Sequence, residues 1–259
     1  MAELKPLLKF DKISLSFGGI TALKDVSFDV EKNSITSIIG PNGAGKTSIF
    51  NCISGIYTPD SGNIVFEDKE ITNMRPNKIA ELGIARTFQN IELFENLTVL
   101  ENILTGVHRR LDYSILSGLF YSSKAKRGEL YARKEAEDII DFLEIEEYRY
   151  SYVMSLPYGI QKRVELGRAL ALAPKLILLD EPAAGMNNEE TEDIARFIID
   201  INEELNISVL LVDHDMNMVT DIAHQITVLN FGEKIADGTP DQVVKNESVI
   251  EAYVGGSKK

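Results

Sequence analysis

The sequence predicts an α/β fold in which a parallel sheet carries helices, an antiparallel pair of strands precedes it, and a helical segment is inserted into it. Short apolar runs alternate with helical patterns in both halves of the chain, and strands that alternate with helices form parallel sheets. A glycine-rich loop separates one of these runs from the helix after it. Residues 98–172 have helical character, which indicates an insertion into the α/β chain.

The first two strands are predicted from alternation of apolar and polar residues. Apolar residues largely alternate from Leu8 to Phe17 and again from Val26 to Val30, with the turn residues Gly18 and Gly19 between the two runs. We therefore expect two antiparallel strands. The other strands are expected at 35–40, 64–66, 83–87, 176–179, 209–212 and 226–229, and the helices at 47–54, 129–147, 191–205 and 216–223.

Composition and charge describe a folded chain and limit its partners. Hydrophobic residues make up 44% and charged residues 26% of the 259 residues, which excludes disorder, collagen and coiled coils. A net charge of −13 would repel a phosphate backbone, so no nucleic-acid partner is expected. No run approaches the roughly 18 apolar residues of a spanning helix, and the first residues do not resemble a signal peptide. We expect a cytosolic chain whose single cysteine, Cys52, serves packing.

A glycine-rich loop before the helix at 47–54 has the residue types that cradle phosphate. It matches the pattern G-x-x-x-x-G-K-[ST], with a strand before it and a helix after it. Its glycines let backbone N–H groups curl around phosphate oxygens, Lys46 reaches the β and γ phosphates, and the Thr47 hydroxyl ligates Mg²⁺. The residues expected to bind the phosphates of a nucleotide here are Gly40, Pro41, Asn42, Gly43, Ala44, Gly45, Lys46, Thr47 and Ser48.

Two acids follow the apolar strand predicted at 176–179. In loops of this kind an acid at the end of a neighbouring strand helps the Ser or Thr to hold Mg²⁺, which fits Asp180. Glu181 is then free to orient a water molecule. A GTPase is not expected, because the run from Asn77 to Ala80 lacks the acid of the guanine-selective pattern N-K-x-D.

Nearly the whole chain resembles the ATP-binding subunits of ABC transporters. Besides the two motifs above, Gln89 resembles the glutamine loop and His214 the switch histidine, and Phe17 is placed like the aromatic residue that stacks on adenine. The run 156–163 lies where the family's signature lies. The resemblance implies a P-loop NTPase (RecA-like) core, with residues 1–259 forming one ATP-binding domain and a helical subdomain at about 98–172.

The resemblance also implies a mechanism in which two subunits sandwich two ATP molecules. The signature helix of one subunit, with Tyr158 and Gly159 at its start, would point at the γ-phosphate held by the other subunit. Glu181 would polarise the attacking water and His214 would contact the γ-phosphate. Gln89 would contact the metal and link the site to a membrane partner. The catalytic set implied is Glu181, His214, Gln89 and Lys46, and the metal set is Thr47, Gln89 and Asp180.

The signature region departs from the family pattern. Pro157 stands where the family has a serine, so a hydroxyl contact to the partner's nucleotide is absent, and Tyr158 stands where the family has a glycine. Asn187 ends the loop after Glu181, where an aspartate is common in the family. Pairing with a different ATPase subunit and pairing with a second copy both remain open.

Two features resemble the longer ATPase subunit of branched-chain amino-acid importers: the ending after Gly238 and a long insertion at about 105–136. The resemblance implies transmembrane permease subunits, a second ATPase subunit and, indirectly, a periplasmic or extracellular binding protein as partners. It places the chain peripherally at the cytoplasmic face of the inner membrane. The alternatives are a urea or amide importer, the ATPase of lipopolysaccharide export, and a soluble iron–sulfur assembly ATPase. The basic residues of the insertion form either a membrane-facing patch or, as we favour, a solvated helical face.

Overall fold

The computed structural model describes residues 5–87, 91–110 and 123–255. The chain divides into two compact units, Met1–Arg86 with Lys175–Lys259, called the core unit here, and Thr87–Pro174, called the helical unit. The segment predicted to be helical, 98–172, lies inside the helical unit. That residues 1–259 act as one ATP-binding domain stays a prediction.

An antiparallel sheet opens the core unit, in the strand order β2-β1-β4-β5. Its members are β1 (Leu8–Phe17), β2 (Ile20–Val30), β4 (Ser61–Phe66) and β5 (Lys69–Glu70). Gly18 and Gly19 join β1 to β2 with φ angles of 53° and 88°, which the primed two-residue hairpin turn requires. The predicted pair of antiparallel strands is confirmed.

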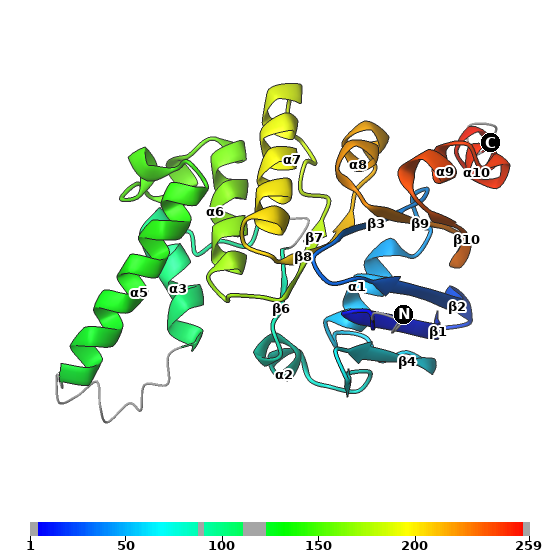
Figure 1. The fold of residues 1–259 in the computed structure, drawn as a ribbon, viewed down its shortest axis with the longest axis horizontal. Helices are drawn as coiled ribbons and strands as arrows, with labels where there is room; N and C mark the ends of the chain where they lie inside the picture. The colour runs from blue at the N-terminus through cyan, green and yellow to red at the C-terminus, as the bar shows by residue number, and fades with distance from the viewer. Residues whose placement is uncertain (1–4, 88–90, 111–122, 256–259) are drawn as a thin grey trace. The chain divides into compact units, whose positions relative to one another are not determined.

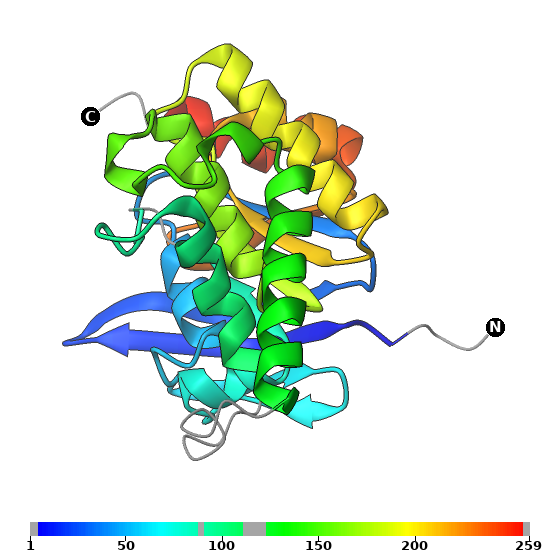
Figure 2. The same ribbon diagram turned by 90° about the vertical axis from the view of Figure 1, so that its left-hand side faces the viewer.

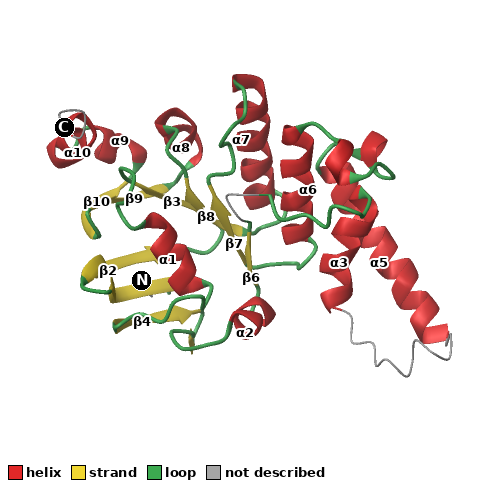
Figure 3. Cartoon of the chain, turned by 180° about the vertical axis from the view of Figure 1, so that it is seen from behind, coloured by secondary structure: helices red, strands yellow, loops and turns green. Residues whose placement is uncertain are grey.

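The second sheet has six strands in the order β10-β9-β3-β8-β7-β6. They are β3 (Ile35–Ile39), β6 (Ile84–Arg86), β7 (Leu176–Asp180), β8 (Ser208–Val212), β9 (Gln225–Asn230) and β10 (Glu233–Gly238). All neighbours pair in parallel except β9 and β10. Every residue of β3, β7 and β8 is buried, as in a sheet covered on both faces. The predicted α/β fold is confirmed, and Figure 3 shows this sheet in yellow.

The two sheets and helix α1 enclose the core of the core unit. Its helices are α1 (Lys46–Ile53), α2 (Pro76–Glu81), α7 (Asn188–Glu203), α8 (Met216–Ile222), α9 (Pro240–Val244) and α10 (Glu247–Gly255). Phe50 of α1 packs in one buried cluster with Phe10 and Phe66 of the antiparallel sheet and Leu178 of the second sheet. In Figure 1, α7 and α8 lie on the other face of the second sheet.

The helical unit packs three helices around its own core. They are α3 (Val99–Arg110), α5 (Ser123–Phe142) and α6 (Tyr158–Leu170), with 3-10 turns at Glu146–Tyr148 and Val153–Ser155. Figure 2 shows α3 and α5 side by side. The predicted helix at 129–147 is wrong at its end, because Glu144 has a φ of 56° and breaks the helix after Phe142.

Basic residues of the insertion pair with acids of α5. His108 lies 3.3 Å from Glu129, and Arg110 lies 3.4 Å from Glu135. These contacts offset part of the insertion's basic charge, and the choice between a solvated helical face and a membrane-facing patch stays a prediction. Among the described residues, no helix is long and apolar enough to cross a bilayer.

Five short elements were not predicted from the sequence: β5, α2, β10, α9 and α10. Each has two to nine residues. Such short segments show too few periods to separate helix from strand. For α9 alone, the capping box that begins at Thr239 was an available signal.

Candidate functional site

The glycine-rich loop that is predicted to bind phosphate, called the phosphate-type loop here, runs from Gly40 to Gly45. It lies between β3 and α1, as the sequence predicts. Two of its glycines are required by the packing around them. A Cβ at Gly40 (φ 153°) would collide with the backbone oxygen of Leu229, and one at Gly45 (φ 104°) would lie 2.7 Å from the backbone oxygen of Ala22. The loop therefore keeps a backbone course that only glycine permits at these two positions.

Lys46 lies at the start of α1 with its side chain folded along the loop. Its Nζ donates hydrogen bonds to the backbone oxygens of Gly40 at 2.7 Å and Pro41 at 3.2 Å, and the residue is only 7% exposed. Burial lowers the pKa of Lys46, while the carboxylates of Glu181, Asp180 and Asp213 act in the opposite direction. The lysine thus shares an electrostatic environment with acids at the ends of two neighbouring strands.

Asp180 ends β7 and is almost fully buried. Its Oδ2 accepts a hydrogen bond from Nη2 of Arg86 at 2.9 Å. Its Oδ1 accepts none from the residues that the structure describes. One oxygen of this predicted metal ligand is therefore fixed, and the other is open.

Glu181 follows in an unusual backbone conformation. Its φ is 47°, a left-handed value that non-glycine residues adopt rarely and that often marks a functional site. Its backbone N–H donates to the oxygen of Val212 at 2.7 Å, which continues the pairing of β7 with β8. The turn brings the carboxylate of Glu181 to within 3.9 Å of Nδ1 of His214.

His214 lies just beyond β8 in a loop held by its neighbour Asp213. Oδ1 of Asp213 accepts hydrogen bonds from the backbone N–H groups of His214 at 2.7 Å and Asp215 at 3.0 Å. Asp213 is 1% exposed, and its Oδ2 has no hydrogen-bond partner among the described residues. Asp215 in turn caps α8.

Sequence reasoning missed Arg86 and Asp213 as members of this site. Asp213 had a usable signal, because it comes directly after the apolar run Val209–Val212, as Asp180 comes directly after the apolar run Leu176–Leu179. Arg86 had none, since its partner lies 94 residues away and depends on the order of the strands.

Of the other predicted nucleotide contacts, Phe17 is exposed and is not a core residue. It is 45% exposed and meets the ring of Tyr57 edge-on at 5.0 Å between centroids. Asn42, Gly43 and Thr47 are also exposed, and Ser48 is half-buried. Gln89 lies outside the described residues.

The predicted signature lies in the helical unit, at the start of α6. Pro157 occupies the N-cap position with φ −54° and ψ 151°, and no side chain caps the helix. Gly159 is buried and Tyr158 is exposed at the first turn. Burial raises the pKa of the Tyr158 hydroxyl, and the charge of Glu165 adds to the effect. The free N–H groups here form an end that attracts anions.

Asn187 has a structural role that an aspartate would also fill. Its side chain accepts from the N–H of Glu190 at 3.0 Å, and Glu190 accepts from the N–H of Asn187 at 3.0 Å. This is a capping box at the start of α7, and Asn and Asp are equally good caps.

The residues fit a magnesium ion that arrives with phosphates. Within the described ranges, no three His, Cys, Asp or Glu side chains converge as a metal site. Mg²⁺ is usually held by one or two protein oxygens together with phosphates and water, and needs no such cage. The open Oδ1 of Asp180 and the exposed hydroxyl of Thr47 provide oxygens of this kind.

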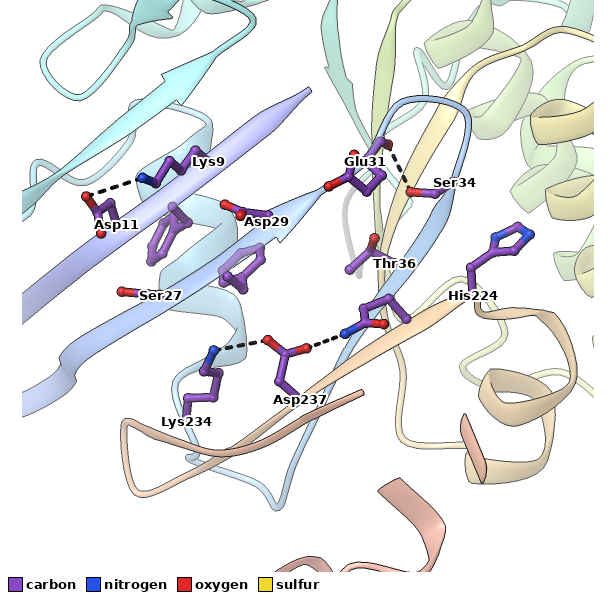
Figure 4. A pocket seen from close by; sticks show the side chains of 13 residues that line it. Lys9, Asp11, Ser27, Asp29, Glu31, Ser34, Thr36, His224, Lys234 and Asp237 are labelled. Carbon is purple, nitrogen blue, oxygen red and sulfur yellow. Dashed lines mark hydrogen bonds and ion pairs between the residues drawn. The ribbon is translucent and has the colours of Figure 1, made fainter. Parts of the chain in front are cut away.

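A cavity of about 530 Å³ lies elsewhere in the core unit, between β1, β2 and the strands β9, β3 and β10 (Figure 4). Two ion pairs lie in its walls, each within one strand: Lys9 is 3.9 Å from Asp11 in β1, and Lys234 is 3.0 Å from Asp237 in β10. Burial raises the pKa of Asp29 in its wall. No residue predicted to bind the nucleotide lines this cavity, so it is not part of the candidate site.

Comparison with known families gives two matches. Residues 23–184 match the family described as "ABC transporter". Residues 233–259 match the family described as "Branched-chain amino acid ATP-binding cassette transporter". The first match spans the phosphate-type loop, Asp180 and Glu181.

Individual proteins resemble this chain over nearly its full length. The high-affinity branched-chain amino acid transport ATP-binding protein BraF of Pseudomonas aeruginosa is 41% identical, over 97% of this chain and 98% of BraF. A nucleotide-free ATP-binding cassette from an ABC transporter superposes with a TM-score of 0.83 at 34% identity, over 96% of this chain and 99% of the other. A dimeric cassette bound to ADP and Pi, MJ0796, superposes with a TM-score of 0.76 at 25% identity, over 90% and 98% of the two chains.

Proposed function

This chain belongs to the ATP-binding subunits of the ABC transporter family, and on that basis we propose that it drives the import of branched-chain amino acids. As a member of the family it binds and hydrolyses ATP. The observation that most supports the importer type is the match of its C-terminal residues 233–259, together with 41% identity to BraF. The ATPase does not touch the cargo, so relatedness along the chain carries this proposal.

The phosphate-type loop would bind the triphosphate. Lys46 would exchange its hydrogen bonds to Gly40 and Pro41 for phosphate oxygens, because these backbone acceptors carry less charge. Asp180 and Thr47 would hold Mg²⁺, which supplies positive charge to the β and γ phosphates when it is bound. Phe17 would stack on the adenine, since its ring is exposed.

Glu181 would orient and polarise the water that attacks the γ-phosphate. Its position beside His214, at 3.9 Å, supports a shared task at that phosphate. His214 would donate a hydrogen bond to a γ-phosphate oxygen, and Asp213 would fix the loop that carries it. Gln89 would complete the set by contacting the metal.

A second ATPase subunit would complete the site. The N-terminus of α6 is an anion-attracting end, and it would face the γ-phosphate that the partner subunit holds. Cassettes of this family dimerise, as MJ0796 bound to ADP and Pi does. Pro157 supports pairing with a different ATPase subunit, because the proline offers no hydroxyl to the partner's nucleotide.

Permease subunits would dock on the helical unit at the cytoplasmic face of the membrane. Tyr150, Tyr152 and Met154 expose large apolar side chains there, in and next to the turn at Val153–Ser155. Such residues are unusual on a free surface when they lie together, and they favour a protein contact. A binding protein outside the membrane would act through the permease.

Reconstitution tests the proposal. The chain would be purified with its permease and partner ATPase in vesicles, and phosphate release measured with a binding protein loaded with leucine, isoleucine or valine. We expect stimulation by these amino acids and no stimulation by urea or short amides. Glu181→Gln should abolish the stimulated rate, whereas Glu189→Gln, an exposed acid on α7, should leave it intact. Stimulation by urea alone would contradict the assigned cargo.

A further inference from the structure

Arg86 is the last residue of β6, and its guanidinium connects two parts of the nucleotide site. Nη2 donates to Oδ2 of Asp180 at 2.9 Å, at the end of the neighbouring strand β7. Nη1 donates to Oδ1 of Asn51 at 2.7 Å, in the helix α1 that begins at Lys46, and lies 3.4 Å from Oγ of Ser54. The planar fork of an arginine holds two partners in fixed relative positions, which a lysine cannot do.

The connection is buried and stacked. The side chains of Arg86 and Asp180 are 9% and 5% exposed. The guanidinium carbon lies 5.5 Å from the centre of the Phe50 ring. Removing one member of a buried ion pair is strongly unfavourable, so this pair is a fixed part of the fold.

The contact leaves Asp180 with one oxygen fixed and one open. Oδ2 is held by Arg86, while Oδ1 accepts no hydrogen bond from the described part of the chain. Carboxylates that ligate metals are commonly held in this way, by a neighbour that orients the second oxygen. We propose that Arg86 is a positioning residue that orients Asp180 as the metal ligand and fixes the position of that carboxylate relative to helix α1.

Two electrostatic effects at Arg86 oppose each other. Its positive charge repels a bare divalent cation. Asp180 offsets this charge, however, because its carboxylate lies 2.9 Å from the guanidinium in the same buried pair. Asn51 and Phe50 also hold Arg86 where it is, so metal binding does not require it to leave. Orientation therefore outweighs repulsion.

The inference rests on the proposed function and is tested by binding, without turnover. ADP would be titrated into the full chain in Mg²⁺ and in EDTA, and the ratio of the two affinities taken as the magnesium enhancement. We expect Arg86→Met to lower this enhancement by about 10- to 100-fold and to leave the affinity in EDTA near wild type. The magnesium enhancement of Arg86→Lys should lie between the values for Arg86→Met and wild type. Arg75→Met, at an exposed position in the core unit, is the matched control and should behave as wild type.

A second background shows whether Arg86 acts through Asp180. In Asp180→Asn, the Arg86→Met change should cause no further loss of enhancement, and an additional loss of similar size would overturn the proposal. An unchanged or increased enhancement in Arg86→Met would also overturn it. If circular dichroism shows that Arg86→Met does not fold, Arg86→Lys decides, and wild-type enhancement in that variant contradicts the proposal. A wild-type chain that binds no nucleotide would overturn the proposed function itself, a result distinct from all of these.

Discussion

Nδ1 of His214 lies 3.9 Å from Oε2 of Glu181, although 33 positions separate the two residues in the sequence. The register of two parallel strands explains this proximity. Asp180, at the end of β7, is paired with Val212, at the end of β8, so the residues that follow each strand emerge at the same edge of the sheet. The pairing of β7 with β8 therefore brings the proposed catalytic pair, Glu181 and His214, together.

Replacing either member of this pair should separate hydrolysis from binding. Glu181→Gln removes the carboxylate that would polarise the water, and a positioned base contributes about 10²- to 10⁴-fold to a rate. We expect phosphate release to fall by that order while ATP affinity is kept, and His214→Ala to act in the same direction. Phosphate release and equilibrium ATP binding would be measured on each variant, with Glu189→Gln as control. Full turnover in Glu181→Gln would remove that residue from the mechanism.

Phe17 should contribute to nucleotide affinity through stacking. Base stacking on an aromatic side chain contributes about 1–3 kcal/mol. Phe17→Ala should therefore weaken ATP binding by that free energy, and Phe17→Tyr should keep it. Thermal unfolding of both variants controls for the lost contact of Phe17 with Tyr57. Equal ATP affinity in Phe17→Ala and wild type would show that the base does not lie on this ring.

Pro157→Ser should strengthen both α6 and self-association. A serine at this N-cap, whose backbone is already extended, can accept a hydrogen bond from the helix and stabilise it by about 0.5–2 kcal/mol. Its hydroxyl would also restore a contact to the partner's nucleotide, where a hydrogen bond to a charged group contributes about 1.5–3 kcal/mol. Light scattering with Mg·ATP would compare Glu181→Gln with the double variant that also carries Pro157→Ser. Equal dimer populations would show that the proline does not limit homodimer formation.

Cys52 should make the fold sensitive to alkaline pH. Burial raises the pKa of its thiol from 9.0 to about 12, so the folded chain keeps a proton that the unfolded chain loses above pH 9. The stabilising contribution is present in full below pH 9 and is lost as the pH rises toward 12, by about 1.4 kcal/mol per pH unit. Urea unfolding between pH 8 and 11 would compare wild type with Cys52→Ala, which should lack this part of the slope. Identical slopes would contradict the raised pKa.

The sequence predicted the parts of the site that depend on local pattern. The loop from Gly40 to Thr47 and the two acids at the end of β7, Asp180 and Glu181, are recognisable because each chemistry needs particular residue types beside a strand. The pairing of Arg86 with Asp180 was not predictable, since it depends on β6 lying next to β7. Asp213 differs from both, because its position after a buried strand was visible but its hydrogen bonds to the His214 loop were not.

The fold was likewise predictable where a local pattern marks an element, and not where a single backbone conformation ends it. Buried strands such as β7 and β8 are apolar at four of their five positions, and the hairpin of β1 and β2 is marked by Gly18 and Gly19. The end of α5 was not visible, because a backbone reversal at Glu144 interrupts a pattern that continues in the sequence.

The most direct test of the nucleotide site is an equilibrium titration of Mg·ATP into Glu181→Gln, with and without the additional change Lys46→Ala. Without turnover, the titration reports binding alone. The account predicts one ATP per chain and a loss of affinity of about 10-fold or more when Lys46 is removed, because a charge-assisted hydrogen bond to phosphate contributes roughly 1.5–3 kcal/mol. Absence of binding in Glu181→Gln, or equal affinity with and without Lys46, would contradict the account.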